Sequence, residues 1–240
     1  MEDSKPTMTT AHQGTIVSIR QLTPTVVELE CQVEPPLSYQ AGQYVMMGFP
    51  GAGPDPQDPP KMFPLALASA PSHPTLTFCI RAREEAFITS FIKDLKVGSS
   101  THIEGPGGAF LYNNPDQHPV VFVATGTGVA PLRSMIRSTP YQEAKPSQAT
   151  MLFGSFTEDD LLYTDEWDTA IDRFIPILSD PDGPWDGETG WVTHFLERAP
   201  DTFFVPEAQY YICGQYEMLG TTKEILVGRG VPASKIYLSQ

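Results

Sequence analysis

Basic residues are scarce in this sequence. Its 240 residues include 15 Lys and Arg against 29 Asp and Glu, which gives a formal net charge of −14. Binding to nucleic acid and attachment to an anionic membrane surface both depend on clustered Lys and Arg, so the charge balance argues against both functions. Long apolar runs are also missing, because the best ones resemble Val120–Ala124 and a membrane-spanning helix needs roughly 18 apolar residues. The composition therefore predicts a soluble protein with no membrane insertion.

Cysteine is rare as well. The three cysteines, Cys31, Cys79 and Cys213, are far apart in the chain. An odd, scattered trio neither forms a disulfide framework nor supplies the close pairs that hold zinc or an iron–sulfur cluster. We therefore expect a cytoplasmic protein with no metal site and no built-in cluster. Residues 1–13 are polar and lack the apolar stretch of a secretory signal, so they are predicted to form a disordered tail.

The sequence from residue 14 to residue 114 consists of short β-rich runs separated by turns. The predicted strands are Thr15–Leu22, Thr25–Val33, Gln43–Gly48, Leu65–Ser69, Thr75–Arg81 and Thr101–Glu104. One helix is predicted at Thr89–Leu95, with Thr89 or Ser90 as its N-cap. Short strands at this spacing predict an antiparallel β-barrel or sandwich.

From residue 115 to residue 240 buried strands alternate with helices. Strands are predicted at 120–124, 150–153, 174–178 and 210–213, and helices at 131–138, 165–173, 192–198 and 216–229. This alternation predicts a doubly wound, Rossmann-like parallel sheet with helices on both faces. The fold class is thus an α+β protein of two domains, with a boundary near Pro115.

Two turns in the second half carry glycine directly after a strand. One is Thr125-Gly126-Thr127-Gly128, which opens a helix, and the other is Cys213-Gly214 with the helix that holds Met218. Amides at a helix N-terminus attract phosphate, and glycines let a pyrophosphate approach the backbone closely. Because ligands bind at the carboxyl ends of parallel strands, we expect both turns to face the same crevice. Taken alone, each turn is better explained by packing, as a strand-to-helix turn that needs small residues or as a buried, inert cysteine.

Together these motifs resemble those of the ferredoxin–NAD(P)H reductase-type flavoproteins. The matching segments are Thr125–Ser134, Phe153-Gly154, Asp160–Tyr163, Leu178-Ser179, Gly190–Val192 and Cys213-Gly214 in the second half, and Ala41–Val45 and Gly105–Phe110 in the first. The resemblance implies FAD and NAD as cofactors. It also implies that residues 14–114 form an FAD-binding barrel and residues 115–240 an NAD-binding domain.

The family typically holds its flavin with an Arg-x-Tyr-Ser segment, whose aromatic ring packs on the isoalloxazine and whose hydroxyl bonds flavin N5. This chain has Phe63, Leu65 and Ala66 at the three positions, so all three side chains are missing. Backbone groups of this segment are then expected to meet the flavin. The resemblance assigns the flavin edge to Phe63, Pro64, Leu65, Ala66, Leu67 and Ser69, and the phosphates to Arg81, Thr89 and Ser90.

For the nucleotide, the resemblance assigns the diphosphate to the turn of Thr125, Gly126, Thr127 and Gly128, with Gly214 and Met218 beside it. Cys213 is expected beside nicotinamide C4, so Cys213 and Ala66 are the two predicted catalytic positions. Relatives that prefer NADPH commonly carry a basic residue where this chain has Asp180. A carboxylate there repels a 2′-phosphate and accepts a hydrogen bond from a ribose hydroxyl, which predicts NADH in preference to NADPH.

These features predict an FAD-dependent oxidoreductase that transfers a hydride from NADH to FAD and passes electrons to a separate small-molecule or protein acceptor. The missing side chains at Phe63, Leu65 and Ala66 leave a second hypothesis open. In it, the chain is a family member without tight flavin binding that acts as a regulatory or electron-transfer complex subunit. Trp191 is expected to be a packing residue.

Overall fold

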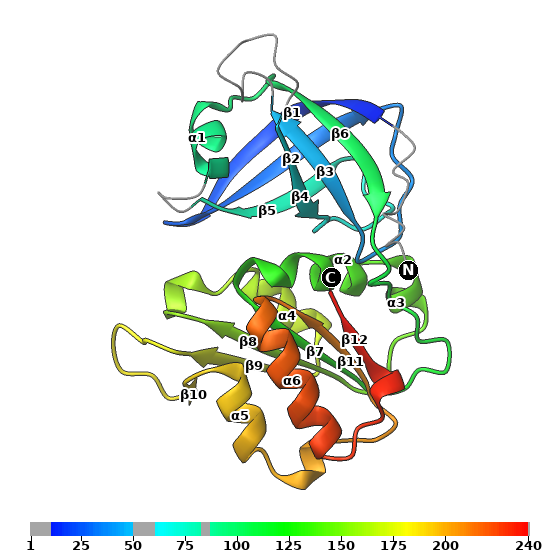
Figure 1. The fold of residues 1–240 in the computed structure, drawn as a ribbon, viewed down its shortest axis with the longest axis vertical. Coiled ribbons are helices and arrows are strands. Elements are labelled where there is room, and N and C mark those ends of the chain that lie inside the picture. The colour runs from blue at the N-terminus through cyan, green and yellow to red at the C-terminus, as the bar shows by residue number, and fades with distance from the viewer. Residues whose placement is uncertain (1–10, 50–60, 83–86, 240) are drawn as a thin grey trace, which may run out of the picture. The chain divides into compact units, whose positions relative to one another are not determined.

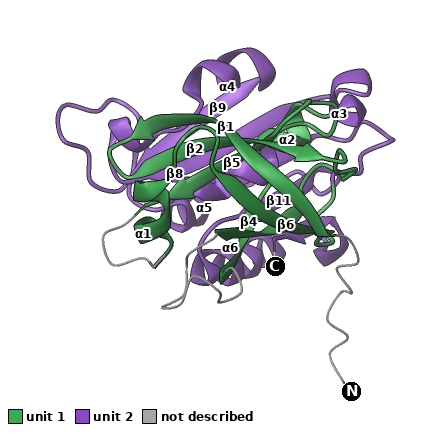
Figure 2. Ribbon diagram, turned by 90° about the horizontal axis from the view of Figure 1, so that it is seen from above, with its two compact units in different colours: residues 1–111, 133–138 green, residues 112–132, 139–240 purple. Residues whose placement is uncertain are grey.

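The computed structural model describes residues 11–49, 61–82 and 87–239. The chain divides into two compact units, coloured separately in Figure 2. Unit 1 consists of residues 1–111 and 133–138, and unit 2 of residues 112–132 and 139–240. The division therefore comes slightly before the boundary expected near Pro115. In addition, a short segment that the sequence pattern placed in the second half groups with the first.

Unit 1 is a six-stranded antiparallel sheet with the strand order β4-β3-β6-β1-β2-β5 (Figure 1). Its elements are β1 (Ala11–Thr23), β2 (Val26–Glu34), β3 (Tyr44–Phe49), β4 (Lys61–Ala66), β5 (Leu76–Arg81), α1 (Phe87–Asp94) and β6 (Ser100–Gly107). Leu67, directly after β4, bridges to Phe78 of β5, so the two edge strands of the sheet meet. Apolar side chains such as Ile16, Leu29 and Val45 fill its core. The predicted antiparallel, barrel-like first half is confirmed.

The first strand begins earlier than predicted. β1 starts at Ala11, so the prediction of a tail is wrong for residues 11–13. The buried His12 stands between the exposed Ala11 and Gln13, which is the alternation of a strand with one face in the core. The rest of the predicted tail, residues 1–10, lies outside the described residues.

Two further elements of unit 1 differ from the predictions. β4 spans Lys61–Ala66 rather than 65–69, and it accommodates Pro64 because it is an edge strand of the hydrogen-bonded sheet. α1 begins at Phe87, so the predicted N-cap role of Thr89 and Ser90 is wrong. Both residues lie inside the first turn of the helix instead.

Unit 2 is a six-stranded sheet with the order β10-β9-β8-β7-β11-β12, in which every pair is parallel. Its strands are β7 (Val120–Thr125), β8 (Ala149–Ser155), β9 (Arg173–Leu178), β10 (Glu188–Thr189), β11 (Gln209–Cys213) and β12 (Ile236–Leu238). Its α-helices are α2 (Val129–Ile136, divided between the units), α3 (Thr139–Glu143), α4 (Thr164–Ala170), α5 (Val192–Arg198) and α6 (Tyr216–Gly228). Strands β7 to β10 run outward on one side and β11 starts on the other side of β7, which confirms the doubly wound topology.

Alternation along the strands of unit 2 divides their side chains between two apolar layers. Val121 and Val123 of β7 pack in one cluster with residues of α5 and α6, which lie side by side against the sheet (Figure 1). Phe122 points the other way, with its ring centroid 6.1 Å from that of Tyr141 in α3 and 5.8 Å from that of Tyr211 in β11. Because both faces of the central strands are buried, a polar ligand is expected at the strand ends.

Candidate functional site

The order of strands in unit 2 changes direction between β7 and β11, and this switch point is where open α/β sheets bind ligands. β7 ends at Thr125 and continues into a 3₁₀ turn at Gly126–Gly128, from which α2 starts at Val129. The helix was expected to start at Pro131, but α2 starts two residues earlier, at Val129. Pro131 fits in the first helical turn because the amide hydrogen that proline lacks would have no partner within the helix there. Residues 125–128 are half-buried between buried neighbours, so this turn is the accessible part of the connection.

The structure brings the two glycine turns into direct contact. A Cβ atom on Gly128 would lie 2.5 Å from the carbonyl oxygen of Cys213 and 2.8 Å from the Cα of Gly214. A Cβ on Gly214 would in turn collide with the side chain of Thr125, whose hydroxyl accepts a bond from Gln215 N at 3.4 Å. Both glycines are therefore required by the close approach of the two turns, Gly128 through backbone atoms and Gly214 through side-chain atoms. They leave a side-chain-free surface of the kind that a pyrophosphate approaches.

Cys213 lies at the carboxyl end of β11 with 9% of its surface exposed. Burial raises the pKa of its thiol to about 11, and a hydrogen bond with the Ser239 side chain opposes that rise. The thiol is therefore neutral at physiological pH, which excludes a role as a thiolate nucleophile. Met218, also predicted here, packs against the unit 2 core, and its sulfur accepts a bond from the Thr222 hydroxyl at 3.3 Å.

Acidic side chains lie at the carboxyl ends of β8 and β9. Asp180 is exposed, and its amide donates to the carbonyl of Phe156 at 2.9 Å, so the segments after these two strands are neighbours. Glu158 and Asp159 on the second segment are also exposed. Between residues 154 and 190 the sequence has one basic residue, Arg173, which begins β9 at the opposite end of the strand from Asp180. This part of the sheet edge is therefore negatively charged.

Three aromatic rings at the same edge of the sheet were missed by the sequence analysis. Phe156 after β8, Trp191 after β10 and Tyr216 after β11 have exposed fractions of 49%, 65% and 90%. The prediction of Trp191 as a packing residue is wrong, although its ring stacks on that of His194 at a centroid distance of 6.0 Å. The usable signal is their position, one to three residues after the end of a parallel strand. Such rings offer flat apolar surfaces to a base.

In unit 1 the predicted flavin segment forms β4 and the residues after it. Phe63 and Leu65 are half-buried and pack against the barrel core, where the Phe63 ring lies 6.0 Å from Phe49 and 5.8 Å from Phe91. Pro64 is exposed and Ala66 is half-buried, on the other side of the strand. The side chains at the positions corresponding to Arg and Tyr in the family motif therefore serve partly as core residues.

The backbone of Ala66 is turned away from the neighbouring strand. Leu67 donates its amide to Gln43 at 3.1 Å, and Ala66 stands opposite Tyr44 in the β3–β4 register. Hydrogen-bonded and non-bonded pairs alternate in an antiparallel ladder, so Ala66 and Tyr44 form a non-bonded pair. The Ala66 amide thus points away from β3, and at Pro64, the preceding residue with the same direction, no amide hydrogen exists.

The remaining predicted residues of unit 1 have different surroundings. Thr89 is 3% exposed and Ser90 is exposed, and both lie in the first turn of α1. Arg81 is half-buried at the end of β5. Ser69 is 2% exposed, and its hydroxyl is bonded to protein groups, namely the Tyr39 hydroxyl at 2.9 Å and the Thr77 amide at 3.0 Å.

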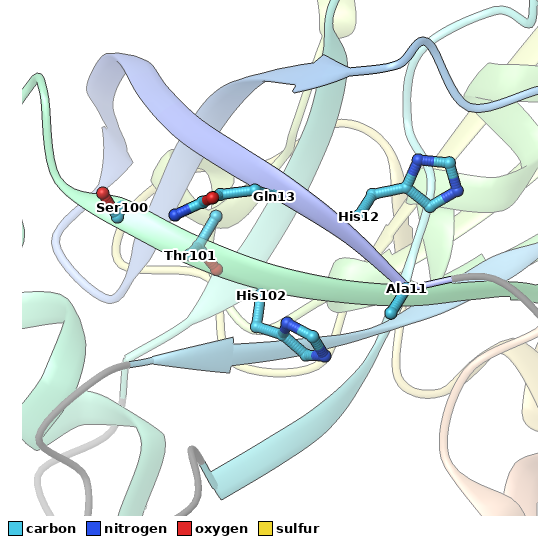
Figure 3. A pocket seen from close by; sticks show the side chains of 6 residues that line it. All are labelled: Ala11, His12, Gln13, Ser100, Thr101 and His102. Carbon is cyan, nitrogen blue, oxygen red and sulfur yellow. The ribbon is translucent and has the colours of Figure 1, made fainter. Parts of the chain in front are cut away.

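A hollow beside β1 and β6 is lined by Ala11, His12, Gln13, Ser100, Thr101 and His102 (Figure 3). The His12 and His102 rings point to opposite sides of the strand pair. His12 bonds the Pro35 carbonyl through Nδ1 at 3.0 Å, and His102 lies 3.1 Å from Glu104. The two imidazoles therefore do not converge on one reacting atom.

Within the described residues, no group of three or more His, Cys, Asp or Glu is arranged to hold a metal ion. In the same part of the chain, no helix is both long enough and apolar enough to span a bilayer. All three cysteines are buried, and none of them forms a disulfide bond.

Comparisons with known proteins agree with this architecture. A family model of the oxidoreductase NAD-binding domain matches residues 122–224. The chain is 28% identical over 241 residues to ferredoxin–NADP reductase B of Sorangium cellulosum, which covers 95% of this chain and 96% of that protein. It is also 28% identical over 229 residues to the phenol hydroxylase P5 protein of Acinetobacter pittii, covering 90% of this chain. The chain spans only 61% of the length of that second relative.

The fold is shared with solved structures. A ferredoxin NADP⁺ reductase from Neisseria gonorrhoeae with bound FAD and NADP matches with a TM-score of 0.82 at 17% identity, over 95% of this chain and 97% of that one. The ferredoxin reductase in carbazole 1,9a-dioxygenase matches with a TM-score of 0.83 at 20% identity, over 95% of this chain and 68% of that one. Both likenesses concern the two-part fold.

Proposed function

The chain belongs to the ferredoxin–NAD(P)H reductase-type flavoproteins, and from this premise we propose that it transfers a hydride from NADH to bound FAD and passes the electrons to a separate acceptor. The observation that carries the proposal is the contact of the two glycine turns at the switch point, where a Cβ on Gly128 would lie 2.5 Å from the Cys213 carbonyl oxygen. This contact joins two family motifs that are far apart in the sequence.

In the proposed nucleotide site the backbone does most of the binding. The turn Gly126–Gly128 and the start of α2 present amides and the positive end of a helix dipole to the diphosphate. Cys213 is proposed beside nicotinamide C4 as a neutral, compact wall of the site. Its protonated thiol carries no charge that would oppose hydride movement. The exposed rings of Trp191 and Tyr216 are proposed to contact the nucleotide from the outside.

The charge at the ends of β8 and β9 supports NADH over NADPH. Asp180 is an exposed carboxylate, and Glu158 and Asp159 lie on the adjoining segment. A 2′-phosphate dianion would be repelled by these groups, whereas a ribose hydroxyl donates a hydrogen bond to a carboxylate. We therefore propose Asp180 as the residue that sets the coenzyme preference.

The residues of unit 1 fit a flavin held mainly by backbone groups. The Ala66 amide points away from β3, so it is placed to donate to the flavin edge where the family motif uses a serine hydroxyl. The first turn of α1, with the backbone of Thr89 and Ser90, is proposed to bind the FAD phosphates. Arg81 is proposed to neutralise their negative charge. When bound, FAD supplies an isoalloxazine ring that accepts hydride and releases electrons.

The electron acceptor is proposed to be a separate molecule, either a protein or a small compound. The three cysteines are all buried and form no disulfide bonds, which suits a reducing, cytoplasmic setting. With a net charge of −14, a protein acceptor with a basic docking face would be favoured electrostatically.

The spectrum of the purified protein tests the proposal. We expect a flavin absorption band in the protein as isolated or after reconstitution with FAD, and anaerobic bleaching of that band on addition of NADH. Protein that stays colourless after reconstitution with FAD would contradict the enzyme and support the regulatory subunit. Phe63 and Leu65 occupy the positions of flavin-binding side chains but are half-buried against the core. This observation favours the regulatory subunit as the second candidate function.

A further inference from the structure

A buried hydrogen-bond network is centred on Ser69 in unit 1. The Tyr39 hydroxyl lies 2.9 Å from the Ser69 hydroxyl, 3.0 Å from the Ser69 carbonyl oxygen and 2.8 Å from the Ala70 carbonyl oxygen. The Thr77 amide of β5 donates to the Ser69 hydroxyl at 3.0 Å. Tyr39, Ser69 and Thr77 are all at most 7% exposed. The buried Ser69 hydroxyl therefore connects its own segment to those of Tyr39 and Thr77.

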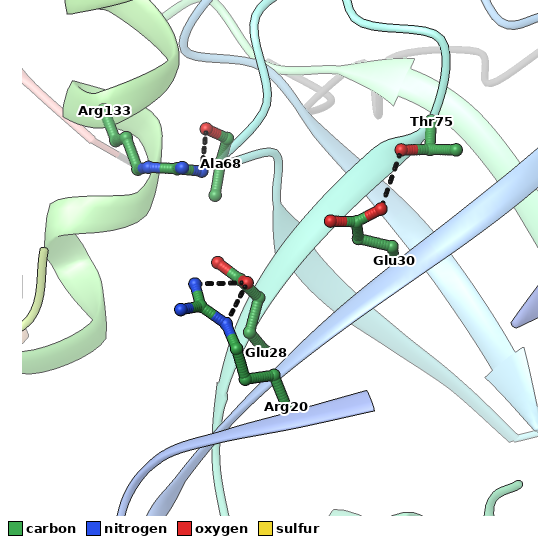
Figure 4. A network of polar contacts seen from close by, with 6 residues as sticks. All are labelled: Arg20, Glu28, Glu30, Ala68, Thr75 and Arg133. Carbon is green, nitrogen blue, oxygen red and sulfur yellow. Dashed lines mark hydrogen bonds and ion pairs between the residues drawn. The ribbon is translucent and has the colours of Figure 1, made fainter. Parts of the chain in front are cut away.

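Helix α2 adds two side chains to this network. Ser134 is fully buried, and its hydroxyl donates to the Ser69 carbonyl oxygen at 2.6 Å. Arg133 is 6% exposed, and its guanidinium donates to the Ala68 carbonyl oxygen at 3.2 Å (Figure 4). A helical serine commonly bonds a carbonyl of its own helix. Ser138, two residues after the end of α2, bonds the carbonyl of Met135 in that helix at 2.6 Å. Ser134 instead bonds a residue 65 positions away in the sequence.

The network bears directly on the presentation of the Ala66 amide. Leu67 donates to Gln43 at 3.1 Å and Ala68 donates to the Thr77 carbonyl at 2.8 Å, so both amides after Ala66 are held by the sheet. Arg133 and Ser134 hold the carbonyls of Ala68 and Ser69. The backbone after Ala66 is thus fixed on both sides: its amides donate to carbonyls of the sheet, and its carbonyls accept from side chains of α2.

We propose that Ser134, Arg133 and Tyr39 are positioning residues for flavin binding, which hold the backbone after β4 so that the Ala66 amide meets the flavin edge. In this role Ser69 acts through its neighbours rather than as a flavin ligand, because its hydroxyl is already bonded on two sides. The proposal rests on the proposed function, since it assigns to these residues the placement of a flavin-binding amide.

Replacement of Ser134 by Ala tests the inference, with Ser138→Ala as the matched control. Both serines are buried, Ser134 within α2 and Ser138 two residues after it; the Ser134 hydroxyl bonds Ser69 of the flavin segment, and the Ser138 hydroxyl bonds Met135. Loss of the donor leaves the buried Ser69 carbonyl with one partner fewer, so we expect FAD binding to weaken about tenfold. The flavin midpoint potential and the visible band should shift, and amide hydrogen exchange at residues 63–70 of the flavin-free protein should accelerate. Ser134→Thr, which keeps the hydroxyl, should restore all of these.

Tyr39→Phe provides a second variant, which removes another hydroxyl that donates to the Ser69 carbonyl oxygen and keeps the ring. It should act in the same direction as Ser134→Ala, and it guards against the case in which Ser134→Ala fails to fold. Unchanged FAD affinity, potential and exchange in both variants would overturn the inference while the proposed function stands. A wild-type protein that cannot bind FAD would overturn both. An effect of Ser138→Ala equal to that of Ser134→Ala would also overturn the inference, since it would mean a general loosening of residues 133–138 rather than the loss of one specific hydrogen bond.

Discussion

The candidate sites of the two units are built in opposite ways. In unit 2 the site forms where glycines let two backbone turns touch, at Gly128 and Cys213. In unit 1 a backbone amide at Ala66 is presented by an edge strand whose continuation is held by buried polar side chains such as Ser134. The first construction tolerates no added atoms, whereas the second tolerates no lost hydrogen-bonding groups. Substitutions that add atoms and substitutions that remove them should therefore separate the two sites.

The largest effect should come from the addition of one methyl group at Gly128. In Gly128→Ala the new Cβ would lie 2.5 Å from the Cys213 carbonyl oxygen and 2.7 Å from its carbonyl carbon, both backbone atoms. The two turns must move apart, and overpacking of this kind typically costs 1–3 kcal/mol. We expect NADH affinity to fall roughly ten- to hundredfold. Titration of the protein with NADH measures the loss.

Gly220→Ala is the matched control for this change. Gly220 lies in α6, and a Cβ there would meet no atom within 4 Å. Alanine in place of a helical glycine should leave NADH affinity unchanged and stabilise the fold slightly. Bound FAD should remain in Gly128→Ala, and its loss would mean that the substitution disturbs both units rather than the nucleotide turn alone.

The contrast between the units also explains what sequence could predict. The pattern of strand, glycine turn and helix around Gly126–Gly128 is local, so it predicted the switch-point turn and its neighbour at Cys213. In unit 1 the flavin segment was located from the family resemblance. Its backbone direction at Ala66 depends on the β3–β4 register, which no local pattern specifies.

The network around Ser69 was beyond sequence reasoning for the same reason. The Ser134 hydroxyl bonds a carbonyl 65 residues earlier in the chain, and serine at a buried helical position carries no signal of its distant partner. The N-cap prediction at Thr89 was wrong because helix boundaries depend on neighbours that propensity does not include. The exposure of Trp191 was mispredicted because aromatic residues usually pack in cores.

A charge reversal at Asp180 should have the next largest effect and should act on unit 2 alone. In Asp180→Arg the exposed carboxylate becomes a guanidinium, which attracts a 2′-phosphate instead of repelling it. We expect the ratio of kcat/KM for NADPH to that for NADH to rise about tenfold, and less at high salt. Glu224→Arg in α6, exposed as well, makes the same change in net charge and should leave the ratio unaltered. If the ratio rose equally in both variants, the change in overall charge would explain it, and Asp180 would have no specific role.

A smaller effect is expected from a hydroxyl added at Ala66 in unit 1. Ala66→Ser supplies the side chain found in the family motif, on the side of the strand opposite the core-packed Leu65. The hydroxyl should add one hydrogen bond at flavin N5, which is worth about 1 kcal/mol, so FAD affinity should rise a few-fold. The midpoint potential should move as well. Identical affinity and potential in Ala66→Ser and Ala66→Gly would show that residue 66 does not face the flavin.

The smallest effect should be that of pH on the nucleotide site of unit 2. Burial raises the pKa of Cys213 from 9.0 to about 11, so the thiol stays neutral and NADH affinity should be flat up to about pH 9. Because the folded-state pKa is raised, the stability contributed by the neutral thiol is complete below its ordinary pKa and is lost as pH rises through about 11. Cys213→Ser, whose hydroxyl does not titrate in this range, should lose less stability than the wild type between those pH values. If wild-type affinity fell between pH 7 and 9 while that of Cys213→Ser stayed flat, the thiol would be reached by solvent, and the description of Cys213 as a neutral wall would be wrong.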